Sequence, residues 1–275
     1  MTFREKLLAA SRRNQSLLCV GLDVVLSSLP KSIASAADPT AAIVAFNAAI
    51  VEATADLVCA YKPNLAFYEA LGAAGLEALR QTLALIPREI PVIGDAKRGD
   101  VGHTAGAYAR ALFEVAGFDA VTVSPYLGRD ALQPFLDYED HGVFVLCRTS
   151  NPGATDFQDL DCGGKPLYQV VAEKVREWDK HGNAGLVVGA TYPSELAAVR
   201  AIVPEMPLLV PGVGAQAGDL HAAVLAAVDT RGEFAVINSS RQVIYASGGA
   251  GFAQAARQAA LATRDAINRA RFGVA

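Results

Sequence analysis

One stretch decides how this chain folds: Val92-Ile93-Gly94-Asp95-Ala96-Lys97-Arg98-Gly99-Asp100-Val101-Gly102-His103-Thr104. It begins as an apolar run after Pro91, which predicts a short buried strand. Asp95 and Lys97 are two residues apart, so their side chains lie on the same face of that strand. Because buried charge is costly unless it is paired, we expect Asp95 and Lys97 to form an ion pair at the end of the strand.

These charged residues have a structural interpretation as well as a functional one. Asp is a favoured capping residue, so Asp100 could be the N-cap of a helix at about 101–116. Asp95 and Lys97 could equally be an ion pair that only seals one end of the fold. The rest of the chain has to decide between the two interpretations.

The composition is that of one large globular domain. The chain has 275 residues, of which 52% are hydrophobic and 19% are charged, and no proline-rich linker divides it. We therefore predict a single domain over residues 1–275. The formal net charge of −4 argues against nucleic acid or an anionic membrane as a partner, so an anionic substrate would need a local basic pocket.

The cysteines and the N-terminus indicate a cytoplasmic protein. Cys19, Cys59 and Cys147 lie in apolar runs, and no CxxC or Cys/His ligand spacing occurs in the chain. We therefore expect free thiols in a reducing compartment and no metal site. Residues at about 2–13 have the pattern of an amphipathic helix and lack the apolar core of a signal peptide.

Apolar runs and amphipathic segments alternate along the whole chain. The runs that predict strands are 17–22, 58–61, 91–96, 120–124, 143–147, 185–189, 207–210 and 234–237. The helices expected after them are 40–56, 67–86, 101–116, 129–139, 167–181, 193–202, 218–228 and 251–271. Eight such units predict an α/β fold in which parallel strands close into a (β/α)8 TIM barrel. The alternative is an open doubly wound sheet, but the glycines of segment 212–218 do not have the spacing of a dinucleotide-binding fingerprint.

Polar residues follow the predicted strands at their C-terminal ends, which is where barrel enzymes carry their active sites. In chain order these residues are Asp23, Lys62, Asp95, Lys97, Ser150, the segment 212–216 and the segment 238–241. Acidic and basic residues that alternate on three consecutive strands favour a functional site over a purely structural one.

Residues on the two sides of the C-terminal end of the predicted barrel indicate different chemistry. After strands seven and eight, Gly212 and its neighbours let the backbone approach an anion, and Arg241 offers a guanidinium fork that suits phosphate oxygens. On the other side, Lys97 is flanked by two carboxylates, which favour its charged form. A charged lysine is a poor Schiff-base nucleophile but a good proton donor, and no Ser, Cys or His has a nucleophile motif around it.

The residues resemble those of a known family. Asp95-Ala-Lys97-Arg-Gly-Asp100 is similar to the Asp-x-Lys-x-x-Asp signature of the orotidine 5′-phosphate decarboxylase family, and Ser124-Pro-Tyr-Leu-Gly128 resembles its bacterial type 2 branch. Gly21-Leu-Asp23, Tyr61-Lys-Pro-Asn64 and Pro211-Gly-Val-Gly-Ala-Gln216 extend the resemblance over nearly the whole chain. The ordered set is far more specific than the signature alone, which sugar-phosphate enzymes on the same barrel share.

The resemblance implies an activity and a catalytic set. The expected reaction is decarboxylation of orotidine 5′-monophosphate to UMP, the last step of de novo pyrimidine biosynthesis, without a metal or an organic cofactor. Lys97 would donate the proton to C6 of the pyrimidine, and Asp95 would lie against the substrate carboxylate. Lys62 and Asp100 would complete an alternating network of charges.

The resemblance also implies a homodimer with shared active sites, in which Asp100 and Thr104 reach in from the second subunit. Asp23 and Lys62 would hold ribose hydroxyls, and Ser150 would bond the pyrimidine. Gln216 and Arg241 would bind the phosphate. The full expected set of substrate-binding residues is Asp23, Thr104, Ser150, Gly212, Gln216, Ser240 and Arg241.

Two rival functions stay open at this point. One is a Mg²⁺-dependent sugar-phosphate decarboxylase or synthase of the same barrel superfamily, although Lys62-Pro63-Asn64 stands where such enzymes would need an acidic residue. The other is a non-catalytic barrel that binds a phosphate ligand. A protein that only binds has no need for the costly Asp95, Lys97 and Asp100 cluster.

Overall fold

Parallel strands form the centre of the molecule. The computed structural model describes residues 1–34, 38–212 and 220–273, and within them eight strands pair in the order β2-β1-β8-β7-β6-β5-β4-β3. The strands are β1 (Leu18–Gly21), β2 (Ala60–Lys62), β3 (Ile93–Arg98), β4 (Ala120–Val123), β5 (Gly142–Arg148), β6 (Ala184–Val188), β7 (Leu208–Val210) and β8 (Ala235–Ser239). The sheet closes between β2 and β3 through two isolated parallel bridges, Tyr61 to Val92 and Asn64 to Asp95. The predicted parallel barrel is therefore confirmed.

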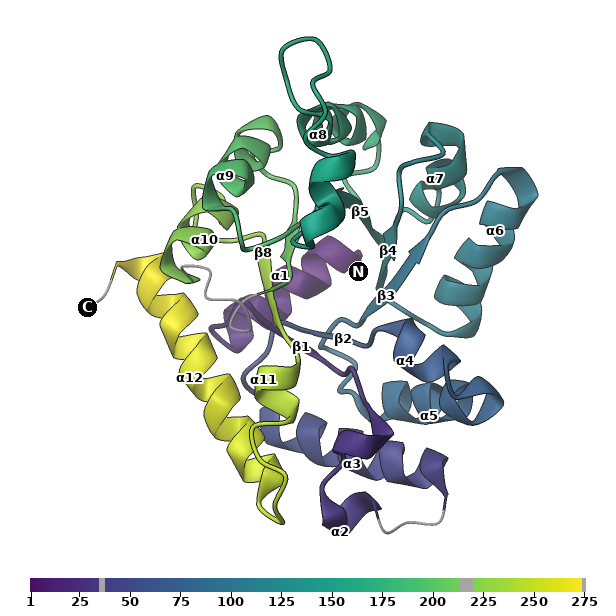
Figure 1. Cartoon of the computed structure of the whole chain (residues 1–275), viewed down its shortest axis with the longest axis vertical. Coiled ribbons are helices and arrows are strands. Elements are labelled where there is room, and N and C mark those ends of the chain that lie inside the picture. Colours follow the sequence, from purple (N-terminus) through teal and green to yellow (C-terminus); the bar gives the residue numbers. More distant parts are fainter. Residues whose placement is uncertain (35–37, 213–219, 274–275) are drawn as a thin grey trace.

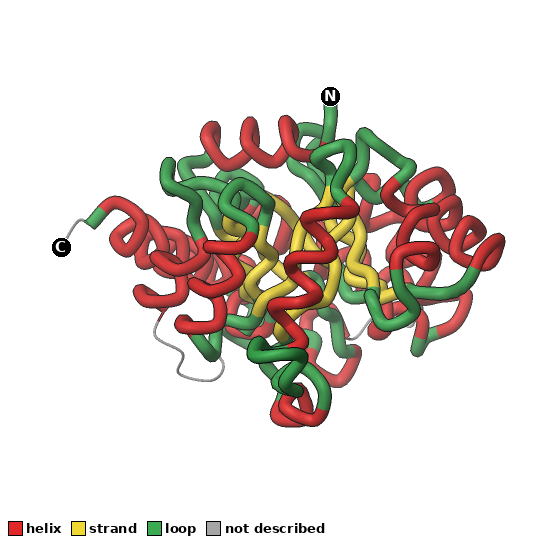
Figure 2. Tube along the Cα trace, turned by 90° about the horizontal axis from the view of Figure 1, so that it is seen from above, coloured by secondary structure: helices red, strands yellow, loops and turns green. Residues whose placement is uncertain are grey.

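Helices surround the strands on the outside (Figures 1 and 2). The α-helices are α1 (Phe3–Arg13), α2 (Lys31–Ala34), α3 (Pro39–Thr54), α4 (Leu65–Glu69), α5 (Gly72–Leu85), α6 (Gly102–Arg110), α7 (Arg129–Leu136), α8 (Leu167–Trp178), α9 (Pro193–Ile202), α10 (Leu220–Ala227), α11 (Arg241–Ile244) and α12 (Phe252–Phe272). Short 3-10 turns lie at η1 (Leu26–Ser28) and η3 (Pro152–Asp156), and η2 (Ala111–Val115) is a π-helical turn. None of the described helices is both long and apolar enough to cross a lipid bilayer.

The inside of the barrel has an apolar core of its own, closed at one end by α1. Ile93, Phe144 and Val236 point inward from three different strands, and Phe3 of α1 packs against the same cluster. The rings of Phe3 and Phe144 meet edge to face with their centroids 5.7 Å apart. Gly142 makes room for this contact, because a Cβ atom there would lie 2.3 Å from the Phe3 ring. The N-terminal end of the barrel is thus sealed by hydrophobic packing.

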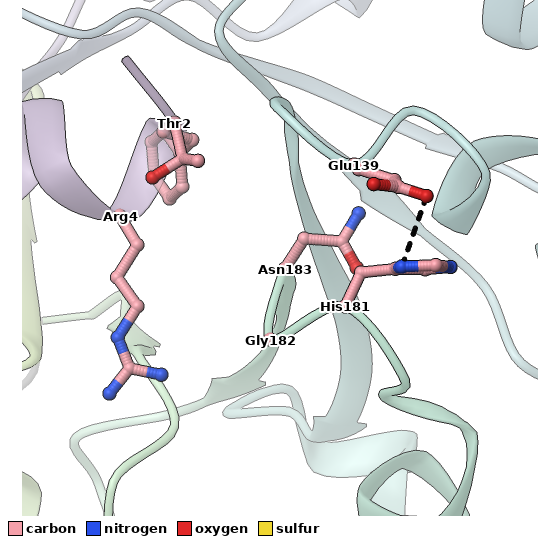
Figure 3. Close-up of a pocket in the computed structure, with 7 residues that line it drawn as sticks. Thr2, Arg4, Glu139, His181, Gly182 and Asn183 are labelled. Atoms are coloured by element: carbon pink, nitrogen blue, oxygen red, sulfur yellow. Dashed lines mark ion pairs between the residues drawn. The ribbon is translucent and has the colours of Figure 1, made fainter.

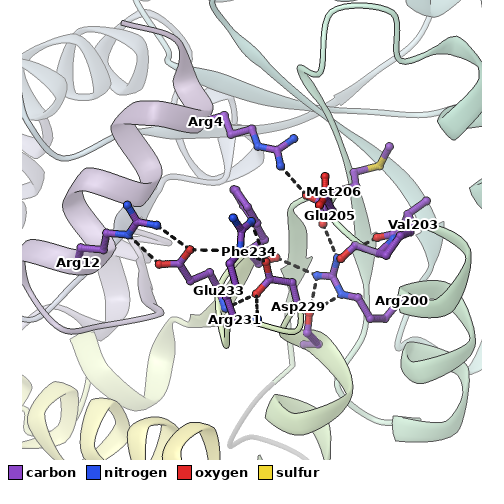
Figure 4. A network of polar contacts seen from close by, with 12 residues as sticks. Arg4, Arg12, Arg200, Val203, Glu205, Met206, Asp229, Arg231, Glu233 and Phe234 are labelled. Carbon is purple, nitrogen blue, oxygen red and sulfur yellow. Dashed lines mark hydrogen bonds and ion pairs between the residues drawn. The ribbon is translucent and has the colours of Figure 1, made fainter.

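Polar contacts fasten the same end of the barrel (Figure 4). Arg12 of α1 donates from Nε and Nη2 to the two carboxylate oxygens of Glu233, at 2.7 and 2.9 Å. Arg200 of α9 donates to main-chain carbonyls, among them those of Met206 at 2.7 Å and Phe234 at 3.0 Å. Burial lowers the pKa of Arg200 to about 10, against the opposing effect of Asp229. These contacts tie the chain segments before β7 and β8 to the helices around them.

Two helices differ from the sequence prediction, and both differences have a backbone cause. The helix expected at 67–86 is two helices, because the chain turns at Gly72, whose φ of +61° is a left-handed conformation that suits glycine. The helix expected at about 101–116 is α6 followed by the π-helical turn η2. Its N-cap residue is Val101, without a side-chain cap, so the interpretation of Asp100 as the N-cap is wrong.

Candidate active site

Three charged side chains meet at the C-terminal ends of β2 and β3. The ammonium group of Lys62 donates to Oδ2 of Asp95 at 2.8 Å, and that of Lys97 donates to Oδ1 at 2.6 Å. The side chain of Lys62 is 5% exposed and that of Asp95 is 10% exposed, whereas that of Lys97 is 47% exposed. The expected pairing of Asp95 with Lys97 is therefore present, and Asp95 binds both lysines at once.

The local electrostatics keep this network charged. Burial alone would raise the pKa of Asp95, but the charges of Lys62 and Lys97 outweigh burial and lower it to about 2. Burial would lower the pKa of Lys62, yet the charges of Asp95 and Asp23 raise it above its ordinary value. The carboxylate and the buried ammonium are thus both ionised near neutral pH.

The network forms one wall of a cavity of about 410 Å³. The opposite wall is apolar and comes from Leu146 of β5, Val187 of β6 and Leu209 of β7. Ser150 lines the same cavity, as its predicted role in binding a substrate requires. The arrangement gives a ligand a charged side and an apolar side, with uncharged polar residues such as Ser150 along the lining.

A second cavity, of about 150 Å³, lies at the ends of β1 and β8. It is lined by predicted substrate-binding residues: Asp23, Gly212, Ser240 and Arg241. A Cβ atom on Gly212 would lie 3.6 Å from Oγ of Ser150, so the two cavities approach each other there. Gly212 has a φ of +92°, a left-handed conformation that other residues rarely adopt. The exposed Arg241 thus lines a cavity that approaches the first one near Gly212.

Two predicted site residues that the structure describes, Asp100 and Thr104, line neither of these two cavities. Asp100 follows the end of β3, and its carboxylate accepts a hydrogen bond from the N–H of Val101 at 2.8 Å. Thr104 lies on the first turn of α6. Neither residue lines the cavity that contains Lys97. Gln216 lies outside the described residues.

Sequence reasoning missed several polar residues of the first cavity, among them Thr122 and Gln158. Thr122 of β4 donates from its hydroxyl to Oδ1 of Asp95 at 2.9 Å. Gln158 lies in the long segment 149–166 and accepts the N–H of Thr149 at 2.8 Å, which folds the segment back onto its own start. Thr122 was visible as a polar residue within an apolar strand, whereas nothing in the sequence pattern indicates the contact of Gln158.

A further cavity lies at the opposite end of the barrel (Figure 3). It has a volume of about 220 Å³ and is lined by the start of α1 and by the turns before β5 and β6. His181 Nδ1 lies 3.2 Å from Glu139 Oε1 there, while Arg4 donates to the main-chain oxygen of Glu205. Arg4 and His181 point in different directions in Figure 3, and the N-terminal face of a barrel generally serves stability. We therefore assign the candidate site to the C-terminal end.

Comparisons with known proteins agree with the family resemblance that the sequence motifs indicate. The model of the orotidine 5′-phosphate decarboxylase / HUMPS family matches residues 16–257. A Thermomicrobium roseum protein named orotidine 5′-phosphate decarboxylase is 56% identical over 278 residues, covering 100% of this chain and 98% of that protein. A protein of the same name from Cupriavidus necator is 55% identical over 275 residues, covering 99% of this chain and 100% of its own length.

A solved structure extends this similarity to three dimensions. The structure of Leishmania donovani OMP decarboxylase matches with a TM-score of 0.87 at 42% sequence identity and covers 99% of both chains. Sequence, family model and fold thus agree over almost the whole length, and the resemblance seen in the motifs is confirmed. The chain belongs to the orotidine 5′-phosphate decarboxylase / HUMPS family.

Proposed function

We propose that this chain decarboxylates orotidine 5′-monophosphate to UMP, the last step of de novo pyrimidine biosynthesis. The observation that carries the proposal is the Lys62–Asp95–Lys97 network, which lies on one wall of the 410 Å³ cavity. The family membership and the names of the relatives support the same reaction. The second cavity, beside Arg241, is the site proposed for the substrate phosphate.

The roles of the charged residues follow from the reaction. When the bond between C6 and the carboxylate breaks, CO₂ leaves and the electron pair stays on C6. The Lys97 ammonium stabilises this developing charge and then transfers a proton to C6, which gives UMP. Lys97 suits this role because its side chain is half exposed to the cavity while Asp95 holds its Nζ at 2.6 Å. Asp95 would lie against the leaving carboxylate.

Binding of the remainder of the substrate is assigned to the rim. We propose that Asp23 and Lys62 hold the ribose hydroxyls, that Ser150 bonds the pyrimidine, and that Arg241 binds the phosphate together with Gly212, Gln216 and Ser240. The phosphate is far from the reacting carbon, so its binding energy can order the loops and exclude water from the site. The burial of Lys62 next to Asp95 keeps the Lys62 ammonium group in a fixed position.

We propose that the reaction needs neither a metal ion nor an organic cofactor. Both carboxylate oxygens of Asp95 already accept hydrogen bonds from ammonium groups, so a Mg²⁺ ion bound there would have to displace a lysine. The two ammonium groups around Asp95 therefore do not favour the rival Mg²⁺-dependent sugar-phosphate chemistry. A non-catalytic role is disfavoured by the cost of burying Lys62 and Asp95 in a site that would only bind.

The test is to follow the loss of orotidylate absorbance with the purified chain, with and without EDTA. We expect turnover that EDTA leaves unchanged. Lys97→Ala should lower turnover by at least ~10²–10⁴, the usual contribution of a general acid. Lys165→Ala, which removes a surface lysine of similar exposure paired with Glu173, is the matched control and should be fully active. Absence of turnover in the wild type would refute the function, and a fully active Lys97→Ala variant would refute the role of Lys97.

We further propose a homodimer in which Asp100 and Thr104 enter the active site of the partner subunit. Asp100 is only partly exposed, yet it makes no ion pair with the lysines of its own described chain. Apolar side chains are also exposed just after the C-terminal ends of β3 and β4, at Val101, Tyr126 and Leu127. Apolar residues exposed next to an incomplete site are consistent with an interface between two copies.

Mixing two inactive variants tests the shared site. Lys97→Ala and Asp100→Asn should each be nearly inactive as homodimers. After subunit exchange half of the dimers are mixed, and each mixed dimer has one site with both lesions and one site with none. Roughly a quarter of all sites should then regain full activity. Verified exchange without recovered activity would show that Asp100 acts within its own chain.

The remaining proposals concern the chain as a whole. We propose that residues 1–275 act as one barrel domain that includes the N-terminal helix, because Phe3 and Leu7 of α1 belong to the core inside the barrel. We propose a cytoplasmic location, which agrees with the four free cysteines. The net charge of −4 supports a small nucleotide as the partner in place of nucleic acid or a membrane surface.

A further inference from the structure

Thr122 of β4 makes two hydrogen bonds with the charged network through its single hydroxyl group. Its side chain points into the barrel and is 1% exposed. The hydroxyl donates its proton to Oδ1 of Asp95 at 2.9 Å and accepts the main-chain N–H of Lys97 at 3.0 Å. A hydroxyl group has one proton and two acceptor sites, so Thr122 can make both contacts at once.

The second contact fills a gap in the strand pairing. Gly94 pairs with Val121, and Arg98 pairs with Val123. Between these two pairs β3 proceeds by four residues while β4 proceeds by only two, so the register shifts. Within this irregularity Lys97 has a φ of +49°, a left-handed conformation that is uncommon for a residue with a side chain. The Lys97 N–H cannot use a regular ladder partner there, and the Thr122 hydroxyl accepts it in place of a carbonyl.

The first contact orients the carboxylate. Oδ1 of Asp95 accepts from Thr122 and from Lys97, whereas Oδ2 accepts from Lys62. A carboxylate that binds two lysines could rotate about its side-chain torsion, which is broad for Asp. A third donor, fixed on a buried strand, holds the plane of the carboxylate and so fixes which oxygen each lysine meets.

We propose that Thr122 is a positioning residue for the decarboxylation. Through one hydroxyl group it fixes both the backbone conformation of Lys97 and the orientation of the Asp95 carboxylate. The inference rests on the proposed function, because positioning has a kinetic meaning only if Lys97 and Asp95 act in the reaction. Thr122 acts through these two residues and takes no part in proton transfer.

The competing explanation is that Thr122 merely fills a strand position. Threonine is common in strands for its branched shape, and valine would then serve as well. Valine has nearly the same shape but no hydroxyl, so Thr122→Val separates the two explanations. Thr122→Ser keeps the hydroxyl and loses only a methyl group. Thr82→Val is the matched control, since the buried Thr82 hydroxyl bonds Asn47 outside the barrel, away from the site.

The kinetic test measures kcat and KM for orotidine 5′-monophosphate in all four proteins, together with their melting temperatures. We expect Thr122→Val to lower kcat roughly 10- to 100-fold, the effect of losing one hydrogen bond to a charged group, and to change KM less than about threefold. Thr122→Ser should retain most of the wild-type kcat. Thr82→Val should lower the melting temperature without changing kcat.

The structural test does not depend on activity. In crystals of Thr122→Val we expect Lys97 to leave its left-handed conformation or the Nζ to Asp95 distance to lengthen. An unchanged Lys97 and Asp95, or a kcat within about twofold of the wild type, would overturn the proposal. If the Val variant does not fold, Thr122→Cys takes its place, because a thiol is a weak donor and acceptor in a similar volume. A wild type without turnover would refute the proposed function instead, and the structural test would still decide the role of Thr122.

Discussion

Replacing Asp95 by Asn removes the negative charge that Lys62 and Lys97 share. The pKa of Asp95 drops from 3.8 to about 2 in the folded chain, which corresponds to about 2.5 kcal/mol of stability at neutral pH. The variant also leaves Lys62 buried without a counter-charge, since its side chain is 5% exposed. Breaking a buried pair in this way costs roughly 3–5 kcal/mol, so we expect Asp95→Asn to lower the free energy of unfolding by that amount at pH 7.

The pH dependence gives the prediction a second, independent measurement. The Asp95 contribution is present above pH 3.8 and is lost as the pH falls toward about 2, so wild type and variant should converge in acid. The pKa of Lys62 is raised in the wild type, so the contribution of Lys62 to stability is present below pH 10.5 and is lost as the pH rises above that value. In the variant burial acts on Lys62 without Asp95, so the variant should instead gain stability as the pH approaches 10.5.

Urea unfolding across this pH range is the assay, with two further proteins as controls. Glu77→Gln breaks an exposed pair with Arg80 and should leave the free energy of unfolding nearly unchanged. The double variant Asp95→Asn/Lys62→Met removes both buried charges and should recover most of the lost stability, although it should be inactive. A loss below about 1 kcal/mol in Asp95→Asn, or no recovery in the double variant, would refute the reasoning.

Two further expectations concern opposite ends of the barrel. Arg241→Ala should weaken binding of orotidine 5′-monophosphate by roughly 1.5–3 kcal/mol while the reaction of the dephosphorylated nucleoside changes little, and an equal loss on both substrates would mean that Arg241 is structural. Arg200→Met removes the donor to the carbonyls of Met206 and Phe234 and should cost roughly 1–3 kcal/mol for each carbonyl left buried without a partner. Urea unfolding measures that loss, and kcat should stay at the wild-type value; a stability change within experimental error would mean that water replaces the guanidinium.

The sequence predicted the barrel because its signal is repeated. Each strand is a short apolar run followed by an amphipathic helix, and an error at one boundary leaves the others in place. Polar residues at the strand ends could be located for the same reason: Asp23, Lys62 and Asp95 all break an apolar run at the point where it leaves the core. Parallel strands bring these ends to one side, so proximity followed from topology.

The local backbone could not be predicted in this way. Strict alternation places Asp95 and Lys97 on one face, but it does not reveal that Lys97 adopts a φ of +49° or that β3 slips against β4. Within this irregularity the Lys97 N–H donates to a hydroxyl group of another strand, 25 residues further along the chain. Gln158 escaped detection for a similar reason, because its contact with Thr149 depends on how the long segment folds back. Both features rest on tertiary contacts that no sequence window contains.

The apolar layer beneath the charged network explains why the network interacts with the cavity and not with the core. Cys19 is fully buried in the inner core, and burial raises the pKa of its thiol to about 12 despite the opposing charge of Lys62. The thiol therefore stays neutral, and the layer below contains apolar side chains such as Ile93 and Phe144. Two ammonium groups then share one carboxylate, with no counter-charge beneath them in the described core. Asp23 adds negative charge near Lys62, so the half-exposed Lys97 is the ammonium group left open toward the cavity. An anionic substrate thus completes a pairing that the fold leaves open, at the group proposed to deliver the proton.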